Sequence, residues 1–128
     1  MGSEMCIRDR PEEALEPYAR SLSVAEARGN ELQVLFDLLG VAIALAALGR
    51  DAEAIEATGL AEAQGAQVAS MSDFAGASSG HLLGDEAIVA AAARLGPAAD
   101  ECLAAGRAIP AARRVAHACA LARTPVAI

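Results

Sequence analysis

Blocks of apolar residues, separated by short polar breaks, predict a chain of α-helices. The clearest block runs from Leu32 to Leu48 (LQVLFDLLGVAIALAAL) and is almost wholly apolar. Gly49-Arg50-Asp51 interrupts it, and Ala52 to Gln64 (AEAIEATGLAEAQ) continues with apolar residues on one side and acids on the other. A helix that is apolar on nearly every side is buried between neighbours. The sequence therefore predicts a buried helix, a tight turn and a second, amphipathic helix.

The same periodicity extends over the rest of the chain. In the first helix, apolar residues recur at spacings of three and four, as at Leu15, Tyr18 and Leu22, which places them on one side of a helix. Pro17 either kinks this helix or moves its start to about Glu16. About six helices are predicted, at residues 11–28, 31–48, 51–64, 85–95, 97–105 and 110–122.

Two features of the third helix bear on its packing. Gly59 lies in mid-helix, where glycine costs about 1 kcal/mol relative to alanine. It indicates either the close approach of a neighbouring backbone or simple sequence drift. Ala54 and Ala61 lie on the side that is expected to pack, whereas Glu56 and Glu62 are expected to face water.

Composition divides the chain into five segments. Residues 1–10 are set apart as a non-native leader, because Met5 to Arg10 (MCIRDR) resembles the translation of a sequencing adapter that recurs in metagenomic reading frames. On this interpretation the natural N-terminus is missing. The other segments are the repeat-like helices at 11–66, a Ser- and Gly-rich linker at 67–84, a C-terminal helical cap at 85–122 and a tail at 123–128.

Charge and length exclude two classes of partner. Residues 11–64 carry ten acids and three arginines, residues 65–128 carry five of each, and the net charge of the chain is −7. Such an acidic surface repels phosphate, so we expect no nucleic-acid binding by this segment. A membrane-associated helix at 32–48 is the competing interpretation of the apolar block. Its uninterrupted run from Leu38 to Leu48 is eleven residues, short of the roughly 20 that span a bilayer, so we expect no membrane insertion.

Few side chains suggest chemistry. Cys102, His117 and Cys119 could serve a small helical enzyme or a metal site. However, structural zinc is held by four ligands, and His117 and Cys119, two residues apart on a helix, point in different directions. Packing is the favoured role for all three. We therefore predict no catalytic residue, no metal and no cofactor, and the free thiols indicate a reducing, cytoplasmic compartment.

The central helix pair resembles a tetratricopeptide repeat. In that family a glycine ends the first helix, and a small residue follows where the two helices cross. Gly49 and Ala54 match these positions, and Ala61 matches a later small one. The resemblance implies an all-α fold of antiparallel helix hairpins that stack into a right-handed superhelix, and a function in protein–protein interaction.

Other positions match this pattern only in part. The small–aromatic–small set of the family occurs in the first helix, at Ala14, Tyr18 and Ser21. The departures lie in the central pair, where Leu38 replaces an aromatic residue, Ala42 replaces a glycine and Ala66 replaces the closing proline.

A second resemblance covers most of residues 51–121. The stretches AIEATGLAEAQ, LG, GRAIP and VAHA, which begin at Ala54, Leu95, Gly106 and Val115, are similar to the closing segment of actinobacterial signal-transduction ATPases. Those large regulators often carry a LuxR-type DNA-binding domain or a nucleotide-cyclase domain. The resemblance implies a non-catalytic helical-repeat tail of a bacterial signalling or transcriptional regulator. The chain has no GxxxxGK[ST] phosphate loop, so no nucleotide chemistry is expected of it.

The strongest candidate site is an apolar surface rather than a reactive group. If the helix at 31–48 is the first helix of a repeat, its concave side forms a candidate partner groove lined by Phe36, Leu39, Ile43, Ala46 and Ala47. Soluble proteins rarely leave an apolar patch of several hundred Å² open to water. We expect it to be covered by a helix of another protein, by the rest of a parent regulator, by a second copy, or by the chain's own helices at 97–105 and 110–122.

Overall fold

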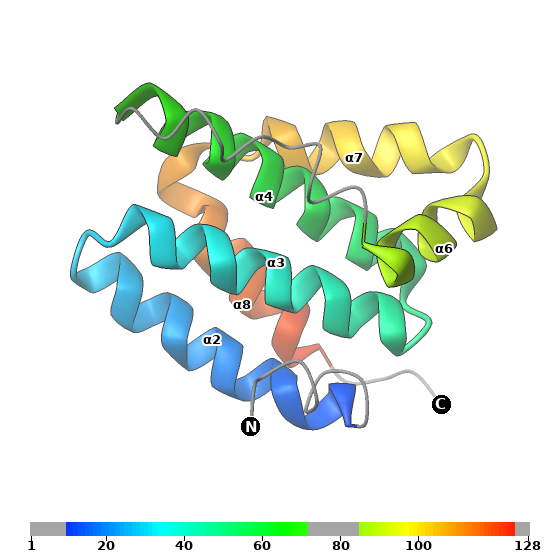
Figure 1. Cartoon of the computed structure of the whole chain (residues 1–128), viewed down its shortest axis with the longest axis horizontal. Coiled ribbons are helices and arrows are strands. Elements are labelled where there is room, and N and C mark those ends of the chain that lie inside the picture. The colour runs from blue at the N-terminus through cyan, green and yellow to red at the C-terminus, as the bar shows by residue number, and fades with distance from the viewer. Residues whose placement is uncertain (1–9, 72–84, 125–128) are drawn as a thin grey trace.

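The computed structural model describes residues 10–71 and 85–124, and within those ranges it contains six α-helices, one 3₁₀ turn and no strand (Figure 1). The predicted all-α class and the predicted number of helices are confirmed. The helices are α2 (Pro11–Ala27), α3 (Glu31–Ala47), α4 (Asp51–Met71), α6 (Glu86–Leu95), α7 (Ala98–Ala108) and α8 (Arg114–Arg123), and the 3₁₀ turn η1 (Ala111–Arg113) immediately precedes α8.

Two tight turns join the first three helices. Each turn contains a glycine with positive φ, Gly29 at 66° and Gly49 at 80°, a conformation that other residues rarely adopt. Asn30 then begins α3 by accepting a hydrogen bond from the backbone N–H of Gln33 at 3.1 Å, as a capping residue does. Pro17 lies inside α2, which begins at Pro11, so the alternative start at Glu16 is wrong.

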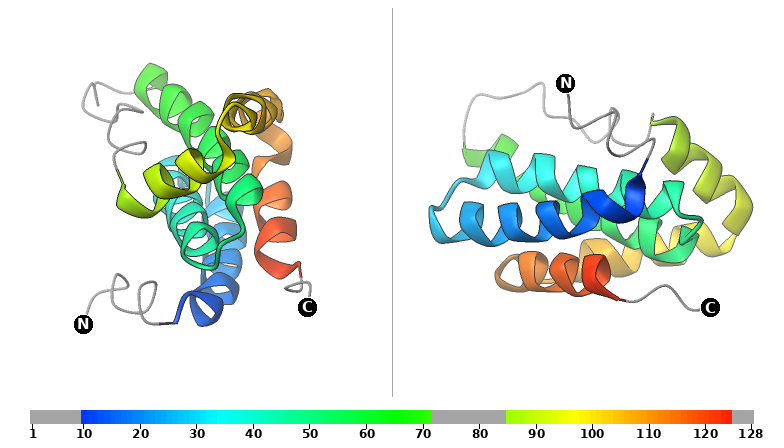
Figure 2. Two further views of the ribbon diagram at one scale, coloured as in Figure 1. Left: turned by 90° about the vertical axis from the view of Figure 1, so that its right-hand side faces the viewer. Right: turned by 90° about the horizontal axis from the view of Figure 1, so that it is seen from below.

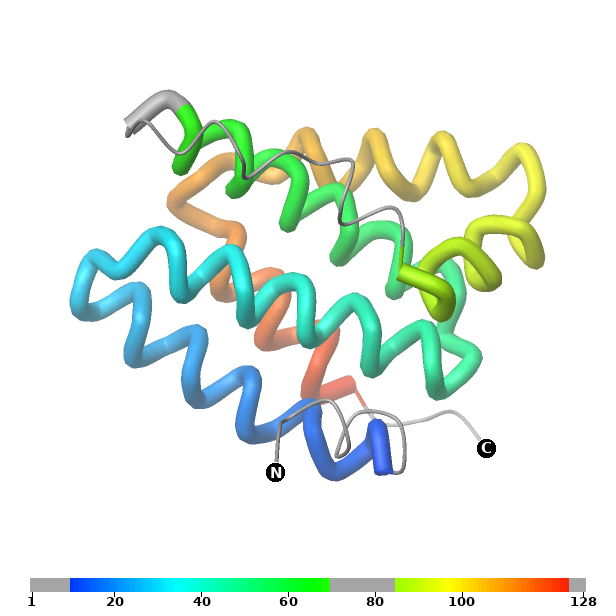
Figure 3. The backbone as a smooth tube through the Cα atoms, viewed as in Figure 1, coloured from blue at the N-terminus to red at the C-terminus, as the bar shows by residue number. Residues whose placement is uncertain are grey.

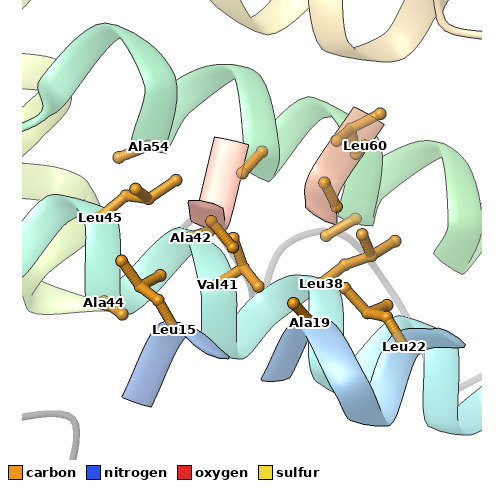
Figure 4. Close-up of a cluster of buried hydrophobic side chains, with 14 of the residues drawn as sticks. Leu15, Ala19, Leu22, Leu38, Val41, Ala42, Ala44, Leu45, Ala54 and Leu60 are labelled. Atoms are coloured by element: carbon orange, nitrogen blue, oxygen red, sulfur yellow. The ribbon is translucent and has the colours of Figure 1, made fainter. Parts of the chain in front are cut away.

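Helices α2, α3 and α4 run antiparallel to their neighbours in sequence and form one layer with α3 in the middle (Figures 1 and 3). The prediction that α3 is buried between neighbours is confirmed, because most of its residues are inaccessible to solvent. The side chains that fill the space between the helices are mostly small or aliphatic (Figure 4). The largest fully buried ones are Leu22, Leu38, Leu45, Leu60, Ile88 and Val41.

One carboxylate lies within this apolar layer. Asp37 of α3 is 3% exposed, and it accepts hydrogen bonds from the hydroxyl of Ser21 at 2.6 Å and from the side-chain amide of Gln33 at 2.9 Å. Ser21 lies on α2 and Gln33 on α3 itself. A buried carboxylate is tolerated when its oxygens are hydrogen-bonded in this way.

Helix α4 is longer than the sequence pattern predicts. It continues to Met71, whereas its predicted end is Gln64. The added turns are held by tertiary contacts: Val68 is buried, and the side-chain amide of Gln67 donates a hydrogen bond to Glu31 of α3 at 3.2 Å. Residues 72–84, the rest of the predicted linker, lie outside the described residues.

Helices α4 and α7 cross with their backbones in contact, and a glycine lies on each side of the crossing. A Cβ atom placed on Gly59 would lie 2.3 Å from the carbonyl oxygen of Leu103. One placed on Gly106 would lie 2.0 Å from the carbonyl oxygen of Glu56. Of the two explanations for the mid-helix Gly59, the structure supports the close approach of a neighbouring backbone.

The last helix returns to the first. From α7 the chain passes through η1 into α8, which lies along α2 and also contacts α3 and α4 (Figure 2). Helix α6 packs on α4 and α3 at the other end of the layer. The C-terminal helices therefore cover part of the layer formed by α2, α3 and α4, whereas Phe36 of the predicted groove stays 56% exposed.

Candidate partner-binding site

The structure divides the predicted groove residues between surface and core. Phe36 is 56% exposed and is the most exposed of three large apolar side chains that are at least half exposed among the described residues. Leu39 and Ile43 are half-buried and pack against the core, and Ala47 is exposed. Ala46 is buried, so it belongs to the core rather than to the surface.

The remaining four residues form a continuous apolar line, which we call the α3 stripe: Phe36, Leu39, Ile43 and Ala47. Their spacings of three and four residues place them on one side of α3. Leu38, only two residues from Phe36 and therefore about 200° around the helix, is fully buried on the opposite side. Periodicity alone thus places four of the five predicted residues together on one side of α3, and Ala46 is the exception.

Helix α8 is held on the layer by polar contacts along its whole length. At its start, Arg114 donates hydrogen bonds to the side-chain oxygens of Gln64 at 3.0 Å and Gln67 at 2.6 Å. Partial burial lowers the pKa of the Arg114 guanidinium, because desolvation disfavours its charged form. One turn later, His117 is hydrogen-bonded through Nε2 to the carboxylate of Glu56.

The C-terminal end of α8 is fixed by two arginines. Arg50, in the turn between α3 and α4, donates to the carbonyl oxygens of Leu121 at 3.0 Å and Thr124 at 3.3 Å. It thereby satisfies carbonyls that a helix end leaves without an intrahelical partner. Arg123 of α8 donates two hydrogen bonds to Glu16 of α2, at 3.0 and 3.1 Å, and these bonds lower the pKa of the Glu16 carboxyl.

The side of α8 that faces α2 carries Cys119. Its thiol lies 3.4 Å from the carbonyl oxygen of Ala19, to which it donates, and 3.9 Å from the hydroxyl of Ser23. An open surface groove of about 380 Å³ runs between the two helices. Its lining residues are Ser23, Glu26, Val115, Ala116, Cys119, Ala120 and Arg123.

The three residues considered for metal binding or catalysis have separate surroundings. Cys102 lies half-buried on α7, His117 contacts Glu56 of α4, and Cys119 contacts α2. Within residues 10–71 and 85–124, no group of three His, Cys, Asp or Glu side chains is placed to hold a metal ion. In the same ranges, no helix has both the length and the apolar character needed to cross a membrane.

One acid expected at the surface is buried. Glu62 of α4 is 6% exposed, and its Oε1 accepts a hydrogen bond from Nε of Arg107 on α7 at 2.6 Å. The expectation that Glu62 faces water is therefore wrong, because α7 covers that side of α4.

Sequence reasoning missed the residues that hold α8, namely Glu16, Arg50, Glu56, Gln64 and Gln67. The uneven charge indicates only that the acidic helices meet basic residues near the C-terminus, and it does not specify which residues pair. Beyond this geometry, no family model matches the chain, and neither a curated protein nor a solved structure matches it.

Proposed function

We propose that this chain is a non-catalytic helical module that binds a helix of another protein through the α3 stripe. The observation that carries the proposal is the exposure of Phe36 beside Leu39 and Ile43 on a helix most of whose residues are buried. Aromatic side chains are enriched at the centres of protein interfaces. An apolar line at these spacings suits the groove-and-helix mode of recognition.

The antiparallel layer of α2, α3 and α4 also supports a tetratricopeptide-like arrangement, because such repeats are built from stacked antiparallel hairpins. In this proposal the module belongs to a larger cytoplasmic regulator of bacterial signalling or transcription. The resemblance of residues 51–121 to actinobacterial signal-transduction ATPases carries that part of the proposal.

A display library of amphipathic helical peptides, selected against the purified chain, tests the proposal. Peptides bound to the α3 stripe should lose about tenfold or more in affinity when Phe36 is changed to serine, a typical loss for a central aromatic residue. Val24→Ser is the matched control, because Val24 is 50% exposed on α2 and lies outside the stripe. Both variants should keep the circular dichroism spectrum and melting temperature of the wild type.

Two outcomes of the selection would contradict the proposal. One is a set of peptides weakened equally by Phe36→Ser and Val24→Ser, and the other is a selection that yields no Phe36-dependent peptide. Light scattering on the same variants identifies a second copy as the occupant of the stripe if the wild-type chain is a dimer and Phe36→Ser makes it a monomer.

A further inference from the structure

Helix α8 and the layer beneath it have opposite charge. The layer formed by α2, α3 and α4 belongs to the acidic part of the chain. From Cys102 to Ile128, by contrast, the chain contains four arginines, one histidine and no acid. Three of these arginines and the histidine meet acceptors on the layer directly. Arg107 of α7 binds Glu62, and from η1 onward Arg114 binds Gln64 and Gln67, His117 binds Glu56, and Arg123 binds Glu16.

Apolar contacts hold α8 only weakly. Its four buried side chains are Val115, Ala118, Cys119 and Ala122. All of them are small, and none is among the largest fully buried side chains of the described residues. The one leucine of α8, Leu121, is only partly buried against the core. Because hydrophobic stabilisation scales with the apolar area removed from water, α8 gains less from burial than α3, which buries Leu35, Leu38 and Leu45.

The layer recognises a helix of a particular chemistry. Its carboxylates and glutamine side chains bind Arg114 and His117 in the first turn of α8 and Arg123 in its last turn. Arg50 binds the last carbonyls of that helix rather than a side chain, so it can bind the end of any helix placed there. Small residues on the buried side let the helix lie close to the layer.

We infer that the layer of α2, α3 and α4 is a receptor for a basic, alanine-rich helix of a partner protein, and that α8 is the occupant built into the chain, which the partner displaces. The α3 stripe is a separate surface, because Phe36 points away from the buried side of α3 on which α8 lies. A partner bound in place of α8 therefore does not depend on the function proposed above for the α3 stripe.

A fluorescent peptide of residues 109–124 serves as the probe, and the full chain serves as the receptor. Ala120→Pro should release α8, because proline in a helix interior removes a hydrogen bond and clashes with the preceding turn. Ala120 is exposed, so the substitution leaves the layer intact. Fluorescence anisotropy should show that the peptide binds Ala120→Pro at least tenfold more tightly than it binds the wild type. Ala120→Ser, which leaves α8 helical, should match the wild type.

Two further measurements make the result specific. A peptide with Arg114→Glu and Arg123→Glu should bind Ala120→Pro at least tenfold more weakly, since both basic contacts are reversed. Adding Phe36→Ser to Ala120→Pro should leave binding unchanged. If Ala120→Pro does not fold by circular dichroism, Arg123→Glu in the chain releases α8 more gently and should also tighten binding of the wild-type peptide.

The inference is overturned if a folded variant in which α8 is released, Ala120→Pro or Arg123→Glu, does not bind the peptide. It is also overturned if that chain binds the charge-reversed peptide equally well, because apolar contact would then be sufficient. Loss of binding with Phe36→Ser would place the peptide on the α3 stripe and overturn it as well.

Discussion

Replacing Gly106 with alanine should destabilise the fold, although alanine is the better helix former. The added Cβ would lie 2.0 Å from the carbonyl oxygen of Glu56. Ordinary contact begins at about 3.4 Å, so α7 would have to move away from α4 by about 1.4 Å. The obstructing atom belongs to the backbone of α4, which cannot rotate away as a side chain can.

The magnitude follows from two opposing terms. Overpacking a close contact costs about 1–3 kcal/mol, and a backbone obstruction places this case toward the upper end. The higher helix propensity of alanine offsets about 1 kcal/mol of this cost when it replaces glycine. We expect a net loss of about 1–2 kcal/mol in the free energy of unfolding. Gly59→Ala should behave similarly, because its Cβ would lie 2.3 Å from the carbonyl oxygen of Leu103.

Urea denaturation followed by circular dichroism at 222 nm measures both variants. Ala104→Gly is the matched control, because Ala104 is an exposed residue of the same helix; it should cost about 1 kcal/mol through propensity alone. The double variant Gly59→Ala/Gly106→Ala should cost less than the sum of the single ones, since one movement of α7 relieves both clashes. If Gly106→Ala stabilises the protein, the two backbones are not in contact and the reasoning fails.

Three further perturbations test other parts of the structure. Leu38→Ala should cost about 2–5 kcal/mol in urea denaturation, because Leu38 is fully buried and its removal leaves a cavity; a cost below about 1 kcal/mol would contradict that placement. Ala54→Leu should cost about 1–3 kcal/mol by overpacking, as Ala54 is fully buried, and a thermal melt no lower than that of the exposed control Ala52→Leu would refute this. The hydrogen bonds from Arg123 lower the pKa of Glu16 below its ordinary value of about 4.5. The Glu16–Arg123 pair therefore contributes its full stability at pH values above about 4.5. That contribution is lost as the pH falls through the lowered pKa, because the carboxylate is then protonated. The urea midpoint of the wild type should accordingly exceed that of Glu16→Gln at neutral pH and converge with it in acid, and a difference that does not change with pH would count against the pair.

Local signals made the helices predictable. The turns at Gly29 and Gly49 follow from residue type, and the burial of α3 follows from its apolar periodicity. The side of α3 on which Phe36 lies was predictable for the same reason, since the position of a residue around a helix depends only on its place in the chain. The predicted end of α4 at Gln64 was wrong because tertiary contacts hold Val68 and its neighbours in the helix. Local helix propensity does not include such contacts.

The contacts of α8 could not be derived from the sequence. They join residues distant along the chain, such as Glu16 with Arg123 and Glu56 with His117. No local pattern indicates that the last helix returns to the first rather than extending the array. The crossing of Gly59 with Gly106 is of the same kind: each glycine is visible in the sequence, but their pairing is a property of the packed helices.

The buried Asp37 has a consequence for how α2 and α3 align. Three of the five buried residues of α2 are alanines, so apolar area alone distinguishes only weakly between alignments of α2 and α3 that differ by one turn. The bond between Asp37 and Ser21 forms in only one of these alignments, and in the others a carboxylate would be buried without its partner on α2. A buried polar residue can thus select one register where apolar packing alone is permissive. The ring of Tyr18 on α2 also lies against Gly40 of α3, where a Cβ would come within 2.3 Å of it. In this chain a buried carboxylate and a glycine under an aromatic ring together favour one alignment of the two helices.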